Sequence, residues 1–434
     1  MNKTDQNQSR EKGFFNITKL FEYVKLFSFP RLAGTMGERQ AVDICYKTFR
    51  KIGHNKDHIH KQNFTFSDFY STTMIQFISI MSLTSILFLF FFGYIFFYIK
   101  ILFIGIMAIL VHLIYNGIKF PENPGFWGEY FGNKIEATNV FVEIPSKNEN
   151  ESVGNIIISA HLDSKSQTFR TYWRIIVYKI WLFSGIIFGI LYILQIIYVE
   201  WMRFSMLPLV KIKIFNFEFS FIEPFIWIIV VFISISNIAL MFLYTDNKSP
   251  GANDNGSGMA IVFELSDYFQ TCPLENFNLW FCQFSAEELG TMGSRFFVKK
   301  YEEIFDKGKV FHINFDMVSA PEAKNNYVQY IKSYGVLPRR ILSPLLGKYF
   351  EKAALKENLV IKTFHLSTGA HTDTVPFHLR KYNAIDIITR DAIKFAHNEI
   401  DTPDKVDPKI LSNACQITKQ VILFIDKDYE KLKN

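Results

Sequence analysis

The sequence predicts an α/β fold that is interrupted by membrane-embedded segments, and three observations support this prediction. Short, continuous apolar runs end at polar residues, which is typical of buried strands in a mainly parallel sheet. Segments of helical length and spacing separate these runs. Four stretches of about 20 apolar residues, each long enough to cross a bilayer, alternate with the remaining, more polar chain. The 434 residues suffice for more than one domain.

Composition excludes several classes of protein. Hydrophobic residues make up 49% of the chain and charged residues only 20%, so an intrinsically disordered chain is excluded. The 22 glycines and 14 prolines are too few for a collagen-like sequence. A net charge of +6 is small for this length, and the basic residues are scattered, so we expect no nucleic-acid binding. The four cysteines form no CxxC pair and leave the redox compartment open.

The individual strands and helices follow from the apolar pattern. Residues 155–159, 279–284, 310–315 and 384–389 are predicted to be strands, and the segments 259–269 and 337–355 are predicted to be helices. Ligand-binding residues of such sheets collect beyond the carboxyl ends of the strands. The residues that follow each predicted strand are therefore the candidates for a binding site.

The apolar excess lies in two predicted helical hairpins. Residues 71–118 contain one formally charged residue, Lys100, which we place in a turn between spans at 74–97 and 101–118. A second pair of spans is predicted at 175–199 and 224–244. Their connection, 201–221, alternates as KIKIFNFEFSF and predicts a strand or an interfacial ribbon. With four crossings, we expect the soluble segments to share one side of the membrane, whereas the turn at Lys100 and the connection 201–221 face the other side.

The predicted domain order follows from these hairpins. The N-terminus is polar and shows no signal peptide. About 70 residues precede the first span, and the basic residues near the span ends are weakly biased, so we expect an integral membrane protein whose soluble part lies on the cytosolic side. We expect an N-terminal helical part (1–70), a first hairpin (71–118), the first part of the main soluble domain (119–173), a second hairpin (174–245) and the second part of that domain (246–434).

Polar residues that bind metals follow three of the predicted strands. The first strand is followed by His161 and Asp163, the second by Glu287 and Glu288, and the third by Asp316. A glycine-rich turn, GANDNGSG, carries Asp254, and the segment after the fourth strand carries His397. Any one of these residues is more often structural than functional. Together, two imidazoles and several carboxylates are the ligands of a pair of divalent ions, with zinc the first choice.

These motifs resemble the co-catalytic dinuclear zinc exopeptidases, a family that includes bacterial leucyl aminopeptidases and glutamate carboxypeptidases. The matching elements are FPRLAGTMGE, SAHLDS, PGANDNGSG, SAEELGTMGS, NFDMVS, TDTVPF and HNEIDTPDKVD. The resemblance covers roughly 300 residues and implies a three-layer α/β sandwich of the zinc exopeptidase type. In the family a short loop normally joins HLDS to the glycine-rich turn, whereas the segment between these motifs in this sequence is long and carries the second hairpin.

The resemblance also implies a role for each residue. His161 and Asp316 would hold one zinc ion, Glu288 and His397 the other, and Asp254 would bridge the two. Glu287 would be the general base, and the chemistry independently calls for a carboxylate that binds no metal to move the proton of the attacking water. Asp163 would accept the second ring N–H of His161 and fix its tautomer. His371 is the competing candidate for the last ligand, and Asp373 corresponds to a family aspartate.

The predicted function is therefore that of a membrane-anchored zinc aminopeptidase acting on peptides through a water activated by two metal ions. A carboxypeptidase or a glutaminyl cyclase on the same scaffold is an alternative, as is a membrane receptor with a peptidase-like fold. A transporter is poorly supported because the spans carry few ionisable residues. An HExxH protease is disfavoured because the motif is missing from the sequence. The sequence does not indicate the oligomeric state.

Overall fold

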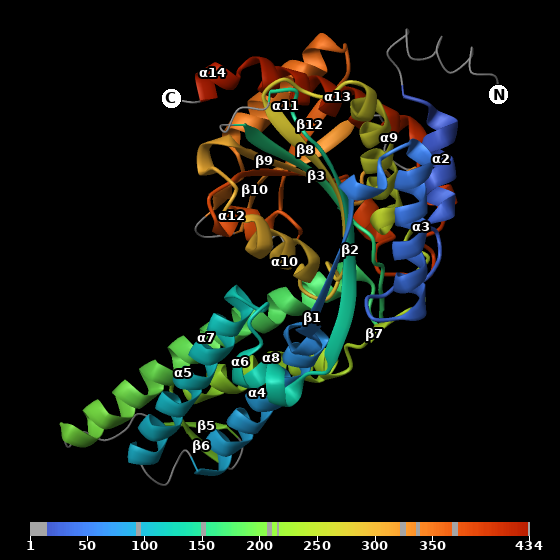
Figure 1. The fold of residues 1–434 in the computed structure, drawn as a ribbon. Helices are drawn as coiled ribbons and strands as arrows, with labels where there is room; N and C mark the ends of the chain where they lie inside the picture. Colours follow the sequence, from blue (N-terminus) through green and yellow to red (C-terminus); the bar gives the residue numbers. More distant parts are fainter. Residues whose placement is uncertain are drawn as a thin grey trace. The chain divides into compact units, whose positions relative to one another are not determined.

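The computed structural model describes residues 15–92, 97–148, 153–205, 211–214, 217–321, 327–335, 339–366 and 372–432. The chain divides into two units, both built from segments that are distant in the sequence (Figure 1). The first unit consists of Met1–Asp68, Phe120–Arg170 and Thr245–Asn434, and the second consists of Phe69–Lys119 and Thr171–Tyr244.

A nine-stranded mixed sheet forms the framework of the first unit. Its central strands β8, β3, β9 and β13 are parallel neighbours, whereas β1 and β2 join one side in antiparallel pairing. All four predicted strands lie in this parallel centre. The strands are β1 (Ile59–Ser67), β2 (Lys134–Ile144), β3 (Gly154–His161), β8 (Phe277–Phe284), β9 (Val310–Phe315), β10 (Val328–Tyr334), β11 (Arg340–Ile341), β12 (Ile361–Leu366) and β13 (Asn383–Ile387), beside a separate pair, β4 (Ser166–Gln167) and β7 (Thr245–Asp246).

Helices cover both faces of the sheet and complete a three-layer sandwich (Figure 1). Successive residues of a strand point to opposite faces, and Ile156 and Ile158 of β3 accordingly join a core cluster different from that of Ile157. The larger cluster contains residues of α2, α3, α9, α11 and α13, and the smaller one contains residues of α10 and α12. The helices are α2 (Ile17–Leu26), α3 (Met36–Ile52), α6 (Gly125–Phe131), α9 (Gly258–Thr271), α10 (Met292–Tyr301), α11 (Pro344–Lys356), α12 (Val375–Leu379), α13 (Pro408–Lys427) and α14 (Tyr429–Leu432).

One predicted helix, residues 337–355, is shorter than expected. The helix α11 begins only at Pro344, after Ser343, whose hydroxyl accepts a hydrogen bond from the amide of Leu346. Proline is favoured in the first turn of a helix, and serine is favoured immediately before it. Upstream, residues 340–341 form the strand β11, and residues 336–338 lie outside the described part. The apolar periodicity of the sequence therefore predicted a start of this helix that is too early.

His54 makes the stability of the first unit depend on pH. It follows Gly53, the left-handed residue that ends α3, and its ring is buried against Phe49 with Nε2 lacking a hydrogen-bond partner. Burial lowers the pKa of His54 to about 4. Between about pH 4 and pH 6.5 the unfolded chain therefore binds more protons at this histidine than the folded chain does. The contribution of neutral His54 to the stability of the folded state is complete above pH 6.5 and is lost as the pH falls toward 4.

Replacing His54 by leucine is expected to weaken this pH dependence. The wild-type histidine accounts for a loss of about 2 kcal/mol in unfolding free energy between pH 7 and pH 5. We expect the thermal midpoint of His54→Leu to fall less than that of the wild type over this interval. His58→Gln, a change at an exposed histidine of the same segment, is the control. Equal shifts in the wild type and His54→Leu would contradict the assignment.

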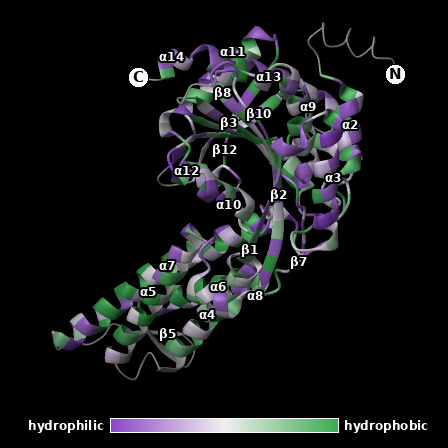
Figure 2. Cartoon of the chain, viewed as in Figure 1, coloured by the Kyte–Doolittle hydropathy of each residue, from purple (hydrophilic) through white to green (hydrophobic). Residues whose placement is uncertain are grey.

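The second unit consists mainly of apolar helices, and hydrophobic residues recur along them (Figure 2). Within the described residues, three helices are long and apolar enough to cross a membrane. A shorter apolar stretch, Ile104–Gly117, lies within a further helix, α5. Lys100 lies inside α5, so placing the turn at Lys100 was wrong: lysine is a good helix former, and one charge does not end a helix. The helices are α4 (Thr72–Phe92), α5 (Phe97–Lys119), α7 (Thr171–Phe204) and α8 (Glu223–Met241).

Asn237 of α8 links three of these helices by side-chain hydrogen bonds. Its oxygen accepts from the indole Nε1 of Trp181 in α7 at 2.8 Å, and its nitrogen donates to Ser82 of α4 at 2.9 Å. Asn237 is fully buried, whereas large apolar residues such as Ile186 and Ile235 are exposed on the same helices. The segment 201–221 contains β5 (Lys211–Ile214) and β6 (Phe217–Ser220), which pair antiparallel as the alternating pattern indicates.

Candidate metal centre

The sheet brings the predicted site residues to one edge. His161 is the last residue of β3, Glu287 and Glu288 follow β8, and Asp316 follows β9 directly. Because these three strands are parallel neighbours, their carboxyl ends meet at the same edge. Asp254 reaches this edge from the turn before α9, and His397 reaches it from the segment after β13.

Five side chains form two groups that share Asp254. His161 Nε2 lies 3.2 Å from Asp254 Oδ1 and 3.5 Å from Asp316 Oδ1. His397 Nε2 lies 3.4 Å from Asp254 Oδ2 and 3.0 Å from Glu288 Oε2. The two oxygens of Asp254 thus face different histidines. We name the groups the first half-site (His161, Asp254 and Asp316) and the second half-site (Asp254, Glu288 and His397), and in each group the ligand atoms lie within 4.8 Å of one another.

Burial and missing hydrogen bonds indicate that these groups suit cations. Asp254, Glu288 and Asp316 are at most 7% exposed. One oxygen of each, namely Asp254 Oδ2, Glu288 Oε1 and Asp316 Oδ1, has no hydrogen-bond partner. Several buried carboxylates are costly unless cations compensate them. Two imidazoles and three carboxylates at this spacing match the ligand preferences of zinc, so the residues fit the expected metal.

Glu287 lies beside the first half-site and belongs to neither group. Its Oε2 is 4.0 Å from His161 Nε2, and the residue is buried. Burial, together with the neighbouring charges of Glu288, Asp316 and Asp373, raises the pKa of Glu287 well above its ordinary range, although His161 opposes the shift. A carboxyl group that lies beside the candidate ligands and belongs to neither group is placed to accept and return a proton.

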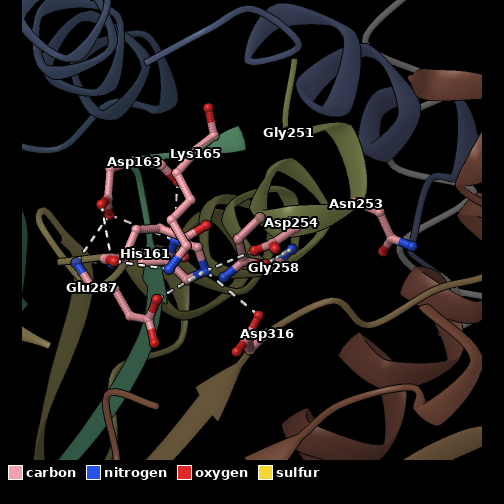
Figure 3. A network of polar contacts seen from close by, with 12 residues as sticks. His161, Asp163, Lys165, Gly251, Asn253, Asp254, Gly258, Glu287 and Asp316 are labelled. Carbon is pink, nitrogen blue, oxygen red and sulfur yellow. Dashed lines mark hydrogen bonds and ion pairs between the residues drawn. The ribbon is translucent and has the colours of Figure 1, made fainter. Parts of the chain in front are cut away.

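Asp163 holds the segment of the two glutamates, a role the sequence did not indicate. Its two carboxylate oxygens accept hydrogen bonds from the backbone amides of Glu287 at 3.1 Å and Glu288 at 3.2 Å (Figure 3). The acceptor closest to His161 Nδ1 is the Asp163 carbonyl oxygen at 3.0 Å, and the carboxylate Oδ1 is at 3.6 Å. Asp163 therefore positions the base and the adjacent ligand through their backbone.

The backbone is left-handed at three residues of this edge. Ala286 precedes Glu287, Met317 follows Asp316, and His397 is itself a candidate ligand, with φ values of 58°, 47° and 58°. Residues other than glycine adopt this conformation at a cost that the surrounding fold must offset, and such residues concentrate at functional sites. Neither helix nor strand periodicity predicts them.

Sequence reasoning missed two residues that hold the ligand loops, Asp401 and Arg31. Asp401 is fully buried and accepts from the amides of Asn253 and Asp254 at 2.9 Å each. Burial and the charge of Asp254 raise the pKa of Asp401 to about 7. Both residues lie inside motifs that resemble the family. Neither is a candidate metal ligand, so a search for ligand side chains does not identify them.

Arg31 connects the two loops that carry His161 and Asp254. Its guanidinium is fully buried and donates to the carbonyls of Leu162 at 2.6 Å, Pro250 at 2.7 Å and Gly251 at 2.9 Å, besides that of Phe27 at 2.6 Å. The buried positive charge of Arg31 also offsets part of the negative charge of the carboxylates at this edge of the sheet.

Replacing Arg31 by methionine is expected to destabilise the first unit and weaken metal retention. The change leaves several buried carbonyls without a donor, at a cost on the order of 3 kcal/mol, so we expect the thermal midpoint to fall by about 5 °C or more. Arg31→Lys is expected to recover only part of the loss, because lysine lacks the planar fork of donors. Arg39→Met, at an exposed position of α3, is the control. An unchanged midpoint for Arg31→Met would refute this role.

Among the residues that the structure describes, the histidines of β12 and α12, His365 and His378, belong to neither metal group. His371, the competing ligand, lies outside the described residues. His365 lies in β12 and contacts Ser333 at 3.1 Å, and His378 lies in α12, where burial lowers its pKa to about 4. Asp373 is fully buried, neither of its oxygens has a hydrogen-bond partner, and burial raises its pKa to about 7.

Comparison with known proteins agrees with this geometry. Residues 239–422 match the model of Peptidase family M28. The predicted family resemblance is confirmed. The M28 region contains Asp254, Glu287, Glu288, Asp316 and His397, whereas His161 and Asp163 precede it.

The similar curated proteins include two bacterial ones. The chain is 27% identical to Aminopeptidase YwaD of Bacillus subtilis over 192 residues, which are 43% of this chain and 40% of that protein. It is 34% identical over 90 residues to the probable lipoprotein aminopeptidase LpqL of Mycobacterium tuberculosis, covering 20% of this chain and 18% of that one. The chain thus matches less than half of the length of these relatives.

Solved structures share the fold. An aminopeptidase from Aneurinibacillus sp. strain AM-1 superposes with a TM-score of 0.53 at 14% identity, covering 94% of this chain and 93% of the other. A zinc aminopeptidase from Bacillus subtilis gives a TM-score of 0.53 at 13% identity, covering 94% and 95%. A glutaminyl cyclase from an Acidobacteriales bacterium gives 0.51 at 14% identity, covering 95% and 96%. At 13–14% identity this likeness shows a shared fold and nothing beyond it.

Proposed function

We propose that this protein is a membrane-anchored zinc aminopeptidase that removes N-terminal residues from peptides. The observation that carries the proposal is the pair of half-sites that share Asp254, with Glu287 beside them. His161, Asp254 and Asp316 hold one zinc ion, and Asp254, Glu288 and His397 hold the other. The family match and the names of the similar proteins support a peptidase, and those names favour the amino end.

The chain itself supplies binding, orientation and proton transfer. Bound zinc ions contribute Lewis acidity toward the scissile carbonyl and the attacking water. The Glu287 carboxylate takes the proton of that water and returns it to the leaving amine. The backbone bonds from Glu287 and Glu288 to Asp163 keep the base at a constant distance from the ligands.

The apolar helices of the second unit support anchoring in a bilayer. Only 6% of the apolar windows of α4 and α7 is buried within the structure, so most of that surface requires an apolar environment. We place α5 in the membrane as a fourth span, with Lys100 near its end, and we retain the order of hairpins and catalytic parts that the sequence predicts. Cytosolic placement predicts that a C-terminal tag on sealed cytosol-side-out vesicles is digested by added protease; protection of the tag would reverse the orientation.

The experiment that tests the activity is the release of free amino acids from aminoacyl amides and short peptides by detergent-purified protein. We expect cleavage of substrates with a free amino terminus, its loss on chelation and its return with zinc. N-acetylated peptides are the matched control and are expected to stay intact. Cleavage from the carboxyl end would replace the aminopeptidase with a carboxypeptidase, and no hydrolysis by zinc-loaded protein would refute the proposal.

A glutaminyl cyclase is the second candidate, favoured by the similarity of fold to the cyclase from an Acidobacteriales bacterium. Peptides with N-terminal glutamine separate the two functions. A cyclase converts them to pyroglutamyl peptides of the same length with loss of ammonia, whereas an aminopeptidase releases free glutamine. Mass spectrometry of the products distinguishes these outcomes.

A further inference from the structure

Lys165 contacts the second half-site and has no role in the proposed reaction. It follows the HLDS segment by one residue, and its side chain is 12% exposed. Its Nζ lies 2.9 Å from Glu288 Oε2 and donates to the Glu288 carbonyl oxygen at 2.9 Å (Figure 3 shows the lysine above the site). The same residue therefore binds both the side chain and the backbone of a candidate metal ligand.

The contact makes the two half-sites chemically different. Glu288 Oε2 is shared between the Lys165 ammonium and His397 Nε2, so only Oε1 lacks a partner. In the first half-site, His161, Asp254 and Asp316 have no lysine or arginine within ion-pair distance among the residues that the structure describes. The second half-site thus has an ammonium group in direct contact with one of its carboxylates, and the first half-site has no such contact among the described residues.

We propose that Lys165 makes the second half-site the weaker of the two zinc sites. An ammonium group that pairs with Glu288 compensates part of the charge that would attract a divalent ion, and it repels that ion at short range. The bonds to Lys165 also leave Glu288 a single free oxygen, which restricts it to one bond with the metal. The first half-site has no such competitor and retains its zinc at lower free zinc concentrations. This inference rests on the proposed zinc centre.

Zinc content at buffered free zinc concentrations tests the proposal. Full-length protein in detergent is equilibrated with a series of zinc buffers, and bound zinc is measured by mass spectrometry of the metal. For the wild type we expect two binding steps: the first fills the first half-site, and the second, at higher free zinc, fills the second half-site. Between the two steps the protein holds one zinc ion. We expect Lys165→Met to tighten the second step by about 10-fold or more, which corresponds to about 1.4 kcal/mol, and to leave the first step unchanged. Lys165→Arg, which keeps the charge, is expected to retain the wild-type separation.

Controls separate the possible failures. Lys248→Met makes the same change at an exposed lysine that pairs with Asp246, and it should leave both steps as in the wild type. An unchanged first step in Lys165→Met shows that this variant is folded. Equal affinities in the wild type, or a weaker second step in Lys165→Met, would overturn the proposal, the latter by making Lys165 a support for Glu288. Zinc bound at neither half-site would instead refute the proposed zinc peptidase.

Discussion

Replacement of Glu287 by glutamine is expected to lower kcat by roughly 100- to 10,000-fold, the range typical of general acid–base catalysis. Glutamine keeps the shape of the side chain but neither accepts the proton of the attacking water nor returns it to the leaving amine. Glu287 belongs to neither half-site, so zinc content should equal that of the wild type. The measurement is the rate of amino-acid release at saturating substrate together with metal content.

The matched control for this variant is Glu288→Gln, the same substitution one residue further on. Glu288 is a member of the second half-site, so its amide variant should lose zinc as well as activity. The two neighbouring glutamates thus have different signatures: one variant is inactive and metal-replete, and the other is inactive and metal-poor. Loss of zinc in Glu287→Gln, or near-wild-type kcat in that variant, would contradict the assignment of the base.

The second large effect is expected from Asp254→Asn, which should weaken both zinc sites at once. Asp254 directs one oxygen toward His161 and the other toward His397, so a neutral amide removes charge from both half-sites. We expect each affinity to fall by more than about 100-fold, beyond the loss typical of residues that only support a ligand. Zinc content and hydrolysis should therefore disappear together at free zinc concentrations that saturate the wild type.

His397→Ala provides the comparison for Asp254→Asn. It is expected to remove one zinc and retain the other, because His397 is a member of the second half-site and not of the first. His371→Ala should retain both ions. If His371→Ala lost one zinc while His397→Ala kept two, the last ligand would be His371. If Asp254→Asn lost only one zinc, Asp254 would not be shared.

Several features of the protein were predictable from the sequence because they depend on local patterns. The central strands β3, β8, β9 and β13 were predicted from continuous apolar runs, since strands buried on both faces have no polar alternation. The motifs at strand ends, in the glycine-rich turn and in the late histidine segment contain the five residues that the structure groups in the two half-sites. The family match confirms the resemblance, and the metal-binding roles of these residues stay predictions. Length and hydrophobicity likewise predicted four spans, and within the described part of the chain three helices are long and apolar enough to cross a membrane.

Other features depend on contacts between residues that are distant in the sequence. Arg31 lies 131 positions from Leu162 and 220 from Gly251, yet it donates to both carbonyls. Asp401 caps the amide of Asp254 across 147 positions, and Lys165 pairs with Glu288 across 123. No periodicity or spacing encodes such partners, because they meet only after parallel strands have brought their carboxyl ends to one edge.

The sequence by itself therefore determined which side chains are available for metal chemistry and that a peptidase-like sheet presents them. The tertiary structure alone decided how they are grouped: that Asp254 faces both histidines, that Asp163 holds the backbone of the glutamates, and that a lysine enters one half-site. The physical reason is that ligand identity is a property of single residues, whereas the charge and orientation at a site are sums over all residues that the fold places around it.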